Sequence, residues 1–306
     1  MNRDIFHIRD LFMRSFLSDL DMGKEFVRTF YPSEITRLLD FSTFKPLSDS
    51  FVSEKLKSTR ADIIFECRTT EKYGNRTFNL CFLIEHKASS YRYASIQIGG
   101  YIFDAYRQQI KEGISPLTPV IPLIYYHGQK DWNPLSVDEI FEEIPSSVEP
   151  YIPSFEWLFE NIGHYSDEEI WQMGSALFTS ALMVQKYTDQ PKALVERFTQ
   201  IFSILESWSD RNLFGSLIVY YIEMIAAEDV LFEDLIEKLP EKMKTEFLSL
   251  ADQLRNEGKA EGKAEGEKET LHKMILNMLQ QGLSIDLISD VAQVSPEYVR
   301  RIRDQQ

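Results

Sequence analysis

The chain has little cysteine and no long apolar run. Two cysteines among 306 residues favour free thiols over a disulfide framework. No stretch approaches the roughly 18 consecutive apolar residues of a membrane-spanning helix. The first twenty residues carry charges at Arg3, Asp4, Arg9 and Asp10 and lack the apolar core of a signal peptide. We therefore expect a cytoplasmic protein with no membrane partner.

Several common catalytic signatures are also missing. The sequence has no glycine-rich phosphate loop and no serine or cysteine nucleophile elbow. Four of its histidines have no partner spacing that indicates a zinc site: His7, His86, His164 and His272. His127-Gly128 ends an apolar run, where open α/β sheets often place ligand groups. A histidine at a strand tip, followed by a turn glycine, explains that pair equally well.

Positive charge is scarce, with a formal net charge of -15. Phosphate binding usually shows as a basic surface, so this value argues against a nucleic-acid partner. The segment from Phe51 to Lys130 nevertheless holds 11 Lys and Arg against 7 Asp and Glu, a balance of +4. The remainder holds 22 against 41, a balance of -19. A locally basic segment could accept a polyanion, whereas acidic helices elsewhere could simply keep the protein soluble.

The first half of the chain alternates between helical and strand patterns. Residues 5–40 carry apolar residues at helical spacing. Residues 60–68 and 77–88 read as strands, a helix follows over about 91–112, and residues 119–128 read as a buried strand. This order predicts an α/β fold, with a mixed sheet flanked by helices.

The second half has a different composition. Between Asp131 and Leu250 there are 7 Lys and Arg against 23 Asp and Glu, with apolar residues at helical spacing. We expect an acidic helical region packed on the core over residues 151–252, after a core domain over 1–150. Residues 253–306 would form a charged linker, which contains the period-four run "EGKAEGKAEG", and a small tail of three helices.

The predicted strand over residues 77–88 ends in charged residues. The segment "FNLCFLIEHKAS" leads from apolar residues directly into Glu85, His86 and Lys87. If Gly74-Asn75 forms a two-residue hairpin turn, Asp62 lies opposite Lys87, and Glu85 lies opposite Ile64. Opposed residues share a face, so two carboxylates and a lysine would project from one side of the sheet.

These three side chains suit a phosphodiester-cleaving site. Two neighbouring carboxylates repel each other unless a cation lies between them, and Mg²⁺ accepts one or two carboxylates together with water and phosphate oxygens. The backbone carbonyl of His86 would add a ligand, and Lys87 would orient the attacking water or balance phosphoryl charge. Spacing alone equally permits a structural Lys87–Asp62 ion pair with Glu85 at a strand end.

Asp62, a hairpin, Glu85-x-Lys87 and a helix together resemble the PD-(D/E)XK nuclease motif, although Ala61 stands where the motif has proline. Gln97-x-x-x-Tyr101 on the helix is similar to an element of one branch of that superfamily. By resemblance, Asp62 and Glu85 would bind Mg²⁺ or another divalent cation, Lys87 would support the water, and Gln97 would position substrate or Lys87. Tyr101 would support these residues from behind. An ordinary half-buried helix face also explains the last two.

Most of the chain resembles the bacterial recombination-promoting nucleases, also described as PD-(D/E)XK family transposases. The matching segments are "FYPSEITRLLDFST", "RADIIFECR", "FLIEHKAS", "PVIPLIYYHGQKDW" and the "EGKAEGKAEG" run. Many members carry Glu-His-Gln at the strand end, whereas Lys87 completes the (D/E)xK triad and favours activity. The resemblance implies a restriction-endonuclease-like core and a Mg²⁺-dependent DNA endonuclease linked to recombination, mobile elements or defence.

The last helices support a function of another class. "LSIDLISDVAQVSPEYVRRI" has helix-turn-helix spacing, and Arg300, Arg301 and Arg303 on its second helix could contact DNA. Nearby acidic residues offset this charge, and small helical tails often only join copies of a chain. The alternative is therefore a catalytically inactive DNA-binding or oligomeric assembly protein.

Overall fold

The computed structural model describes residues 3–47, 62–70, 79–141, 143–204, 211–226, 228, 232–241, 244–245, 285, 289 and 295–303. The chain divides into two compact units, Met1–Leu239 and Pro240–Gln306. The expected Gly74-Asn75 turn, the charged run over 254–269 and most of the first two tail helices lie outside the described residues. No described helix combines the length and the hydropathy needed to cross a membrane.

The first unit begins with helices and then builds a sheet. Its first half contains α1 (Arg3–Ser18), α2 (Leu20–Phe30), α3 (Ser33–Thr36), β1 (Leu39–Pro46), β2 (Asp62–Thr69), β3 (Asn79–Lys87), α5 (Ala94–Lys111) and β4 (Val120–Tyr126). Its second half contains α6 (Val137–Ile140), η1 (Glu149–Tyr151), β5 (Leu158–Asn161), η2 (Ile162–His164), α7 (Asp167–Trp171), α8 (Ala176–Lys186), α9 (Pro191–Ser203), α10 (Arg211–Ile225) and α11 (Phe232–Ile236).

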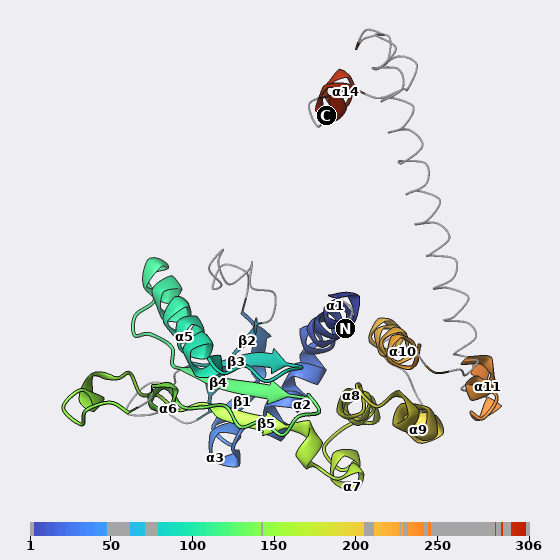
Figure 1. Ribbon diagram of the computed structural model, residues 1–306, viewed down its shortest axis with the longest axis horizontal. Helices are drawn as coiled ribbons and strands as arrows, with labels where there is room; N and C mark the ends of the chain where they lie inside the picture. The colour runs from blue at the N-terminus through green and yellow to red at the C-terminus, as the bar shows by residue number, and fades with distance from the viewer. Residues whose placement is uncertain are drawn as a thin grey trace. The chain divides into compact units, whose positions relative to one another are not determined.

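The strands form one five-stranded mixed sheet in the order β1-β2-β3-β4-β5 (Figure 1). β1, β2 and β3 pair antiparallel, whereas β4 pairs parallel to β3 and β5 pairs parallel to β4. β3 is the central strand, and its residues from Leu80 to His86 are all buried. The predicted α/β class and mixed sheet are confirmed.

Helices cover the two faces of this sheet. On one face, α5 packs through Ile98 and Ile102 against a cluster that includes Leu83 and Ile124. On the other face, Tyr31 meets Phe82 edge to face, with ring centroids 4.9 Å apart. The aromatic residues of α2 also contact Tyr125 on β4 and Phe178 on α8. Alternation along each strand therefore sends successive side chains into two different helical layers.

The hairpin register differs from the predicted one by two residues. Asp62 pairs with Glu85, and Ile64 pairs with Leu83, so the predicted pairings of Asp62 with Lys87 and Ile64 with Glu85 are wrong. The prediction depended on a two-residue turn at Gly74-Asn75, and turn geometry fixes register. Because side chains alternate with a period of two, a shift of two residues keeps the same residues on the same face.

The region after Trp132 is not wholly helical. β5 extends the sheet by four residues within a segment that we expected to be helical. It pairs parallel to β4 from Leu158 to Asn161. A strand this short carries too few alternating residues to be recognised from periodicity, and its place is fixed by the edge of β4.

Gly99 and Gly100 have different roles in α5. A Cβ atom at Gly99 would lie 3.0 Å from the ring of Phe155, so a larger residue there would require this ring to shift. A Cβ atom at Gly100 would have no neighbour within 4 Å. The first glycine permits close packing against the segment before β5, and the second is tolerated.

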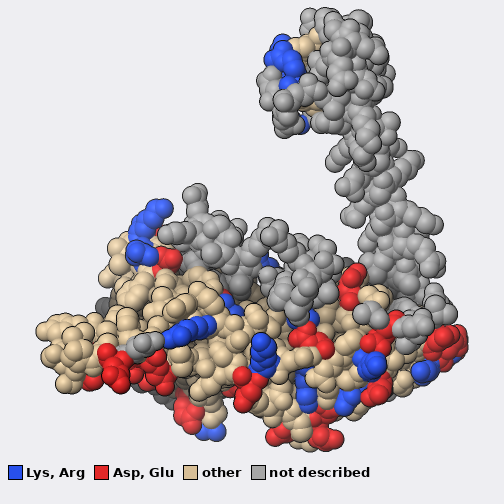
Figure 2. Space-filling model, in the orientation of Figure 1, with Lys and Arg blue, Asp and Glu red and all other residues tan. Residues whose placement is uncertain are grey.

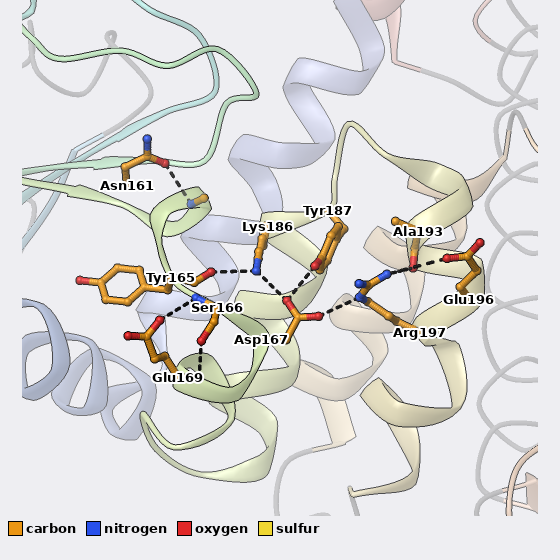
Figure 3. A network of polar contacts seen from close by, with 11 residues as sticks. Asn161, Tyr165, Ser166, Asp167, Glu169, Lys186, Tyr187, Ala193, Glu196 and Arg197 are labelled. Carbon is orange, nitrogen blue, oxygen red and sulfur yellow. Dashed lines mark hydrogen bonds and ion pairs between the residues drawn. The ribbon is translucent and has the colours of Figure 1, made fainter.

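A polar network joins the helices that follow the sheet (Figure 3). Asp167 accepts hydrogen bonds from Lys186 at 2.6 Å, Tyr187 at 2.7 Å and Arg197 at 2.9 Å. Burial raises the pKa of Asp167, but the hydrogen bonds from these three residues outweigh it and hold the pKa below its ordinary value. One carboxylate thus connects α7, α8 and α9.

The second unit contributes one described helix of eight residues, α14 (Pro296–Arg303). Pro296 occupies its first position, as predicted from Ser295-Pro296, because the missing N–H of proline is an unsatisfied group there in any helix. Ile302 is buried, whereas Arg300, Arg301 and Arg303 are exposed.

Candidate active site

Glu85 and Lys87 meet at the carboxyl end of β3. Lys87 Nζ lies 2.7 Å from Glu85 Oε1, although the Glu85 side chain is only 1% exposed and that of Lys87 is 16% exposed. Charged groups this deeply buried are costly unless they are paired. Glu85 and Lys87 are two residues apart and so share a face of β3, whereas the side chain of His86 between them points to the opposite face.

Gln97 on α5 completes a closed triangle with this pair. Its Oε1 accepts a hydrogen bond from Lys87 Nζ at 2.7 Å, and its Nε2 donates to Glu85 Oε1 at 3.0 Å. The same Nε2 donates to the hydroxyl of Tyr101, one turn further along the helix, at 2.5 Å. The structure therefore brings four of the predicted residues into one network, with Gln97 bridging strand and helix.

The strand pairing defines where Asp62 lies relative to the site. It begins β2 and is the direct partner of Glu85 in the antiparallel register. Directly paired residues have Cβ atoms about 4.5–5.5 Å apart and share a face of the sheet. The corrected register thus places Asp62 beside Glu85, closer to it than the predicted register did.

A further acidic residue on this face, Glu66, has a different environment. Its two carboxylate oxygens are taken up by Asn79 at 2.6 Å and by Lys45 at 2.8 Å. Both oxygens have partners, so Glu66 is held in a structural arrangement. Glu85 differs because its Oε2 is buried and has no hydrogen-bond partner among the described residues.

The unpaired oxygen of Glu85 fits a cation site. A buried carboxylate oxygen without a donor is costly, and a divalent cation would satisfy it. The Lys87 carbonyl accepts from the His127 N–H at 3.1 Å, and alternate carbonyls of a strand point to opposite neighbours. The His86 carbonyl is therefore directed toward β2, the strand that carries Asp62. Within the described side chains, no three His, Cys, Asp or Glu residues are grouped to hold a metal.

The side chains of His86 and His127 lie on the opposite face. Their rings stack with centroids 4.4 Å apart and an interplanar angle of 12°. Burial lowers the pKa of His127 well below its ordinary value of 6.5, and the neighbouring His86 and Arg9 lower it further. His127 therefore does not join Glu85. Gly128 is more than a turn residue, since a Cβ there would lie 2.6 Å from the Ala88 carbonyl.

The cysteines take no part in the site. Cys67 and Cys81 are both free and buried, as expected from their number. Burial raises the pKa of Cys81 to about 12, with a further contribution from Glu66. A thiol with such a pKa stays protonated near neutral pH and is a poor nucleophile.

Sequence reasoning missed Tyr91, in the loop between β3 and α5. Its ring centroid lies 5.5 Å from Lys87 Nζ, within the range of a cation–π interaction. Tyr93 contacts it edge to face at 5.9 Å. The detectable signal was the segment Tyr91-Arg92-Tyr93, in which two aromatic residues flank an arginine directly after the charged strand end.

The face of the molecule in Figure 2 shows no continuous basic surface over the described residues. Lys and Arg side chains alternate there with Asp and Glu side chains. The arginines of α14 belong to the second unit, where Arg300 lies 3.8 Å from Glu297 on its own helix. Long-range attraction by a basic face is therefore not evident on this side.

Comparison with known proteins identifies relatives over most of the chain. It is 26% identical over 251 residues to the recombination-promoting nuclease RpnA of Escherichia coli (strain K12), covering 80% of this chain and 82% of the relative. It is 24% identical over 238 residues to RpnD of Escherichia coli O157:H7, covering 76% and 87%. No solved structure is significantly similar.

One relative is named as inactive. The inactive recombination-promoting nuclease-like protein RpnE of Escherichia coli (strain K12) is 22% identical over 293 residues, covering 94% of each chain. The family model described as "Putative transposase, YhgA-like" matches residues 7–212, which include the sheet and α5. The chain therefore belongs to the YhgA-like transposase family, and its relatives include proteins named as recombination-promoting nucleases.

Proposed function

We propose that this protein is a Mg²⁺-dependent DNA endonuclease with a PD-(D/E)XK core within residues 1–150. One observation carries the proposal. Glu85 Oε1 is shared by Lys87 and Gln97, while its buried Oε2 has no partner among the described residues. A purely structural ion pair gives no reason to leave that oxygen unsatisfied.

The chemistry follows from the positions of the side chains. Glu85, Asp62 across the hairpin and the His86 carbonyl would hold the cation, which lowers the pKa of bound water and neutralises charge on a phosphate. Lys87 would then orient the attacking water through its N–H donors. Gln97 would fix the direction of the Lys87 ammonium, and Tyr101 would fix the Gln97 amide in turn.

The names of two relatives support a nuclease, since RpnA and RpnD are named as recombination-promoting nucleases. DNA is accordingly the proposed substrate. The local charge agrees with this choice, because the segment from Phe51 to Lys130 has a balance of +4 in a chain of -15. Catalysis would thus depend on a locally basic segment of the chain and a bound cation.

A second candidate is a catalytically inactive DNA-binding or oligomeric assembly protein. Two observations favour it: RpnE is named as inactive, and α14 carries three arginines against one acidic residue, Glu297. In this case Arg300, Arg301 and Arg303 would contact DNA phosphates, or the tail would join copies of the chain. Binding would weaken with salt and with loss of these arginines, and no strand would be cut.

Cleavage of supercoiled plasmid DNA separates the two candidates. The full chain should nick or linearise plasmid in Mg²⁺ and should lose this activity in EDTA. Asp62→Ala and Glu85→Gln should each lose it as well. Glu66→Gln is the matched control, because it changes a buried carboxylate on the same face whose oxygens already have partners.

Two results would contradict the nuclease proposal. Wild-type cleavage of equal rate in EDTA would exclude a role for the cation. Equal cleavage by Asp62→Ala and the wild type would mean that the activity belongs to another site or to a contaminant.

A further inference from the structure

Aromatic side chains are exposed immediately beside the proposed active site. Tyr91 is 46% exposed and Tyr93 is 47% exposed, so nearly half of each residue is open to solvent. Both lie in the loop that joins β3 to α5, only a few residues after Lys87. The two rings contact each other, and a contiguous exposed apolar area beside a proposed active site is a candidate binding surface.

The geometry fixes this surface relative to Lys87. The Tyr91 ring centroid lies 5.5 Å from Lys87 Nζ, and the Tyr91 and Tyr93 rings stand at 77° to each other, 5.9 Å apart. The ammonium that holds Tyr91 is itself held by Glu85 and Gln97. The aromatic pair is therefore connected to the network that would act on a phosphate.

A positive charge between the two tyrosines in the sequence also indicates the ligand. Arg92 is exposed and stands between the two tyrosines. An aromatic ring offers a stacking face to any nucleobase, and a guanidinium binds phosphate or stacks as well. Proteins that bind single-stranded nucleic acid combine these two elements, whereas the bases of an intact duplex have no free face to offer.

We propose that Tyr91, Arg92 and Tyr93 form a platform on which an unpaired base next to the cleaved phosphate stacks. This inference rests on the proposed nuclease function and deepens it: the preferred substrate is DNA with unpaired bases, such as a single strand, a gap or a frayed end. Arg92 binds the adjoining phosphate. Lys87 and Glu85 then act on the next phosphodiester along the strand.

Base stacking can be measured without cleavage. A single-stranded oligonucleotide that contains 2-aminopurine is titrated with the full-length Glu85→Gln variant, and quenching of its fluorescence reports stacking. We expect quenching that persists when Tyr91 and Tyr93 are changed to Phe. Changing both to Leu should remove the quenching and weaken binding about 5- to 100-fold.

Cleavage of matched substrates gives the second measurement. In Mg²⁺, the wild type should cut the single strand faster than the same strand in a blunt duplex. The Tyr91→Leu/Tyr93→Leu variant should lose this preference. Tyr151→Leu is the control, because Tyr151 is 84% exposed and belongs to the separate element η1.

The outcomes distinguish this inference from the function on which it rests. Quenching that depends on the two rings, without any cleavage, supports the platform and contradicts the nuclease. Cleavage with no quenching and no change of preference in the Leu variant overturns the platform and leaves the nuclease. A change of oligomeric state in the Leu variant, with unchanged DNA binding, also overturns it, because a second copy would then cover the rings.

Discussion

Glu85 and Lys87 stand two residues apart on β3 and are joined by an ion pair of 2.7 Å. The carboxylate is almost fully buried, so its charge depends on the ammonium for stability. Gln97 binds both partners from α5. In the protein without a cation, Lys87 thus contributes to the stability of the fold as well as to the proposed chemistry.

Loss of Lys87 should therefore cost stability. Lys87→Ala removes the ammonium group that pairs with the buried Glu85 carboxylate. In EDTA, this change should lower the free energy of unfolding by about 3–5 kcal/mol. Urea unfolding measures the difference. The Glu85→Gln/Lys87→Ala double variant should recover part of the loss, and equal stability of Lys87→Ala and wild type would refute a stabilising pair.

A divalent cation should raise the melting temperature of the wild type. Binding to the folded state alone stabilises it by about 2.7 kcal/mol when the free ion is at a hundred times its Kd. Differential scanning fluorimetry with added Mg²⁺ measures the shift. Asp62→Ala and Glu85→Gln should show little or no shift, whereas Glu66→Gln should respond like the wild type. A full shift in Glu85→Gln would place the ion elsewhere.

Gln97 should act by positioning Lys87. Gln97→Leu removes the acceptor for Lys87 and the donor to Glu85, and it should lower kcat about 10- to 100-fold. Tyr101→Phe removes the hydroxyl that accepts a hydrogen bond from the Gln97 amide and should have a smaller effect. Steady-state cleavage kinetics distinguish a positioning role of Gln97 from substrate binding. An effect confined to KM would mean that Gln97 only binds substrate.

Stability should fall in mild acid because of His127. Burial keeps its folded-state pKa well below the ordinary value of 6.5, so the unfolded chain takes up the proton first as the pH falls. This contribution is complete above pH 6.5 and is lost below it, by up to about 1.4 kcal/mol per pH unit. Urea unfolding between pH 7.5 and 5.5 should show a shallower pH dependence for His127→Phe, but not for His164→Gln, whose side chain is 62% exposed.

Asp167 should matter more than its neighbour Glu196. Asp167→Asn weakens hydrogen bonds to Lys186, Tyr187 and Arg197, and we expect a loss of about 3 kcal/mol. Glu196 lies 4.0 Å from the same Arg197, but its side chain is 76% exposed. Glu196→Gln should therefore cost less than about 1 kcal/mol. Similar losses for both variants, measured by urea unfolding, would contradict a central role for Asp167.

The sequence was most informative where hydrophobic patterns were long. The order strand, strand, helix, strand followed from runs of apolar residues, and β2, β3, α5 and β4 lie within two or three residues of the predicted limits. The predicted register of the β2–β3 hairpin was wrong by two residues, because it depended on a turn assumed at Gly74-Asn75. The prediction of which residues share a face of the sheet was still correct, because side chains alternate with a period of two and the error was a shift of two residues.

The residues of the candidate site could be proposed from the sequence, but the contacts among them could not. The Glu85–Lys87 spacing placed both residues on one face, but the contacts of Gln97 depend on how far α5 lies from β3. That distance is set by packing, for example of Gly99 against Phe155, which no local pattern reveals. The roles of Glu66 and His127 likewise depend on partners far away in the sequence.

The polar contacts that join Glu85, Lys87, Gln97 and Tyr101 to one another link a single strand to the start of the helix that follows it. Only Asp62 comes from outside this short segment. A few codons therefore encode nearly all of the arrangement, so one point mutation there could silence it and another could restore it. Related genes could thus gain or lose such a centre repeatedly while the rest of the scaffold stays the same.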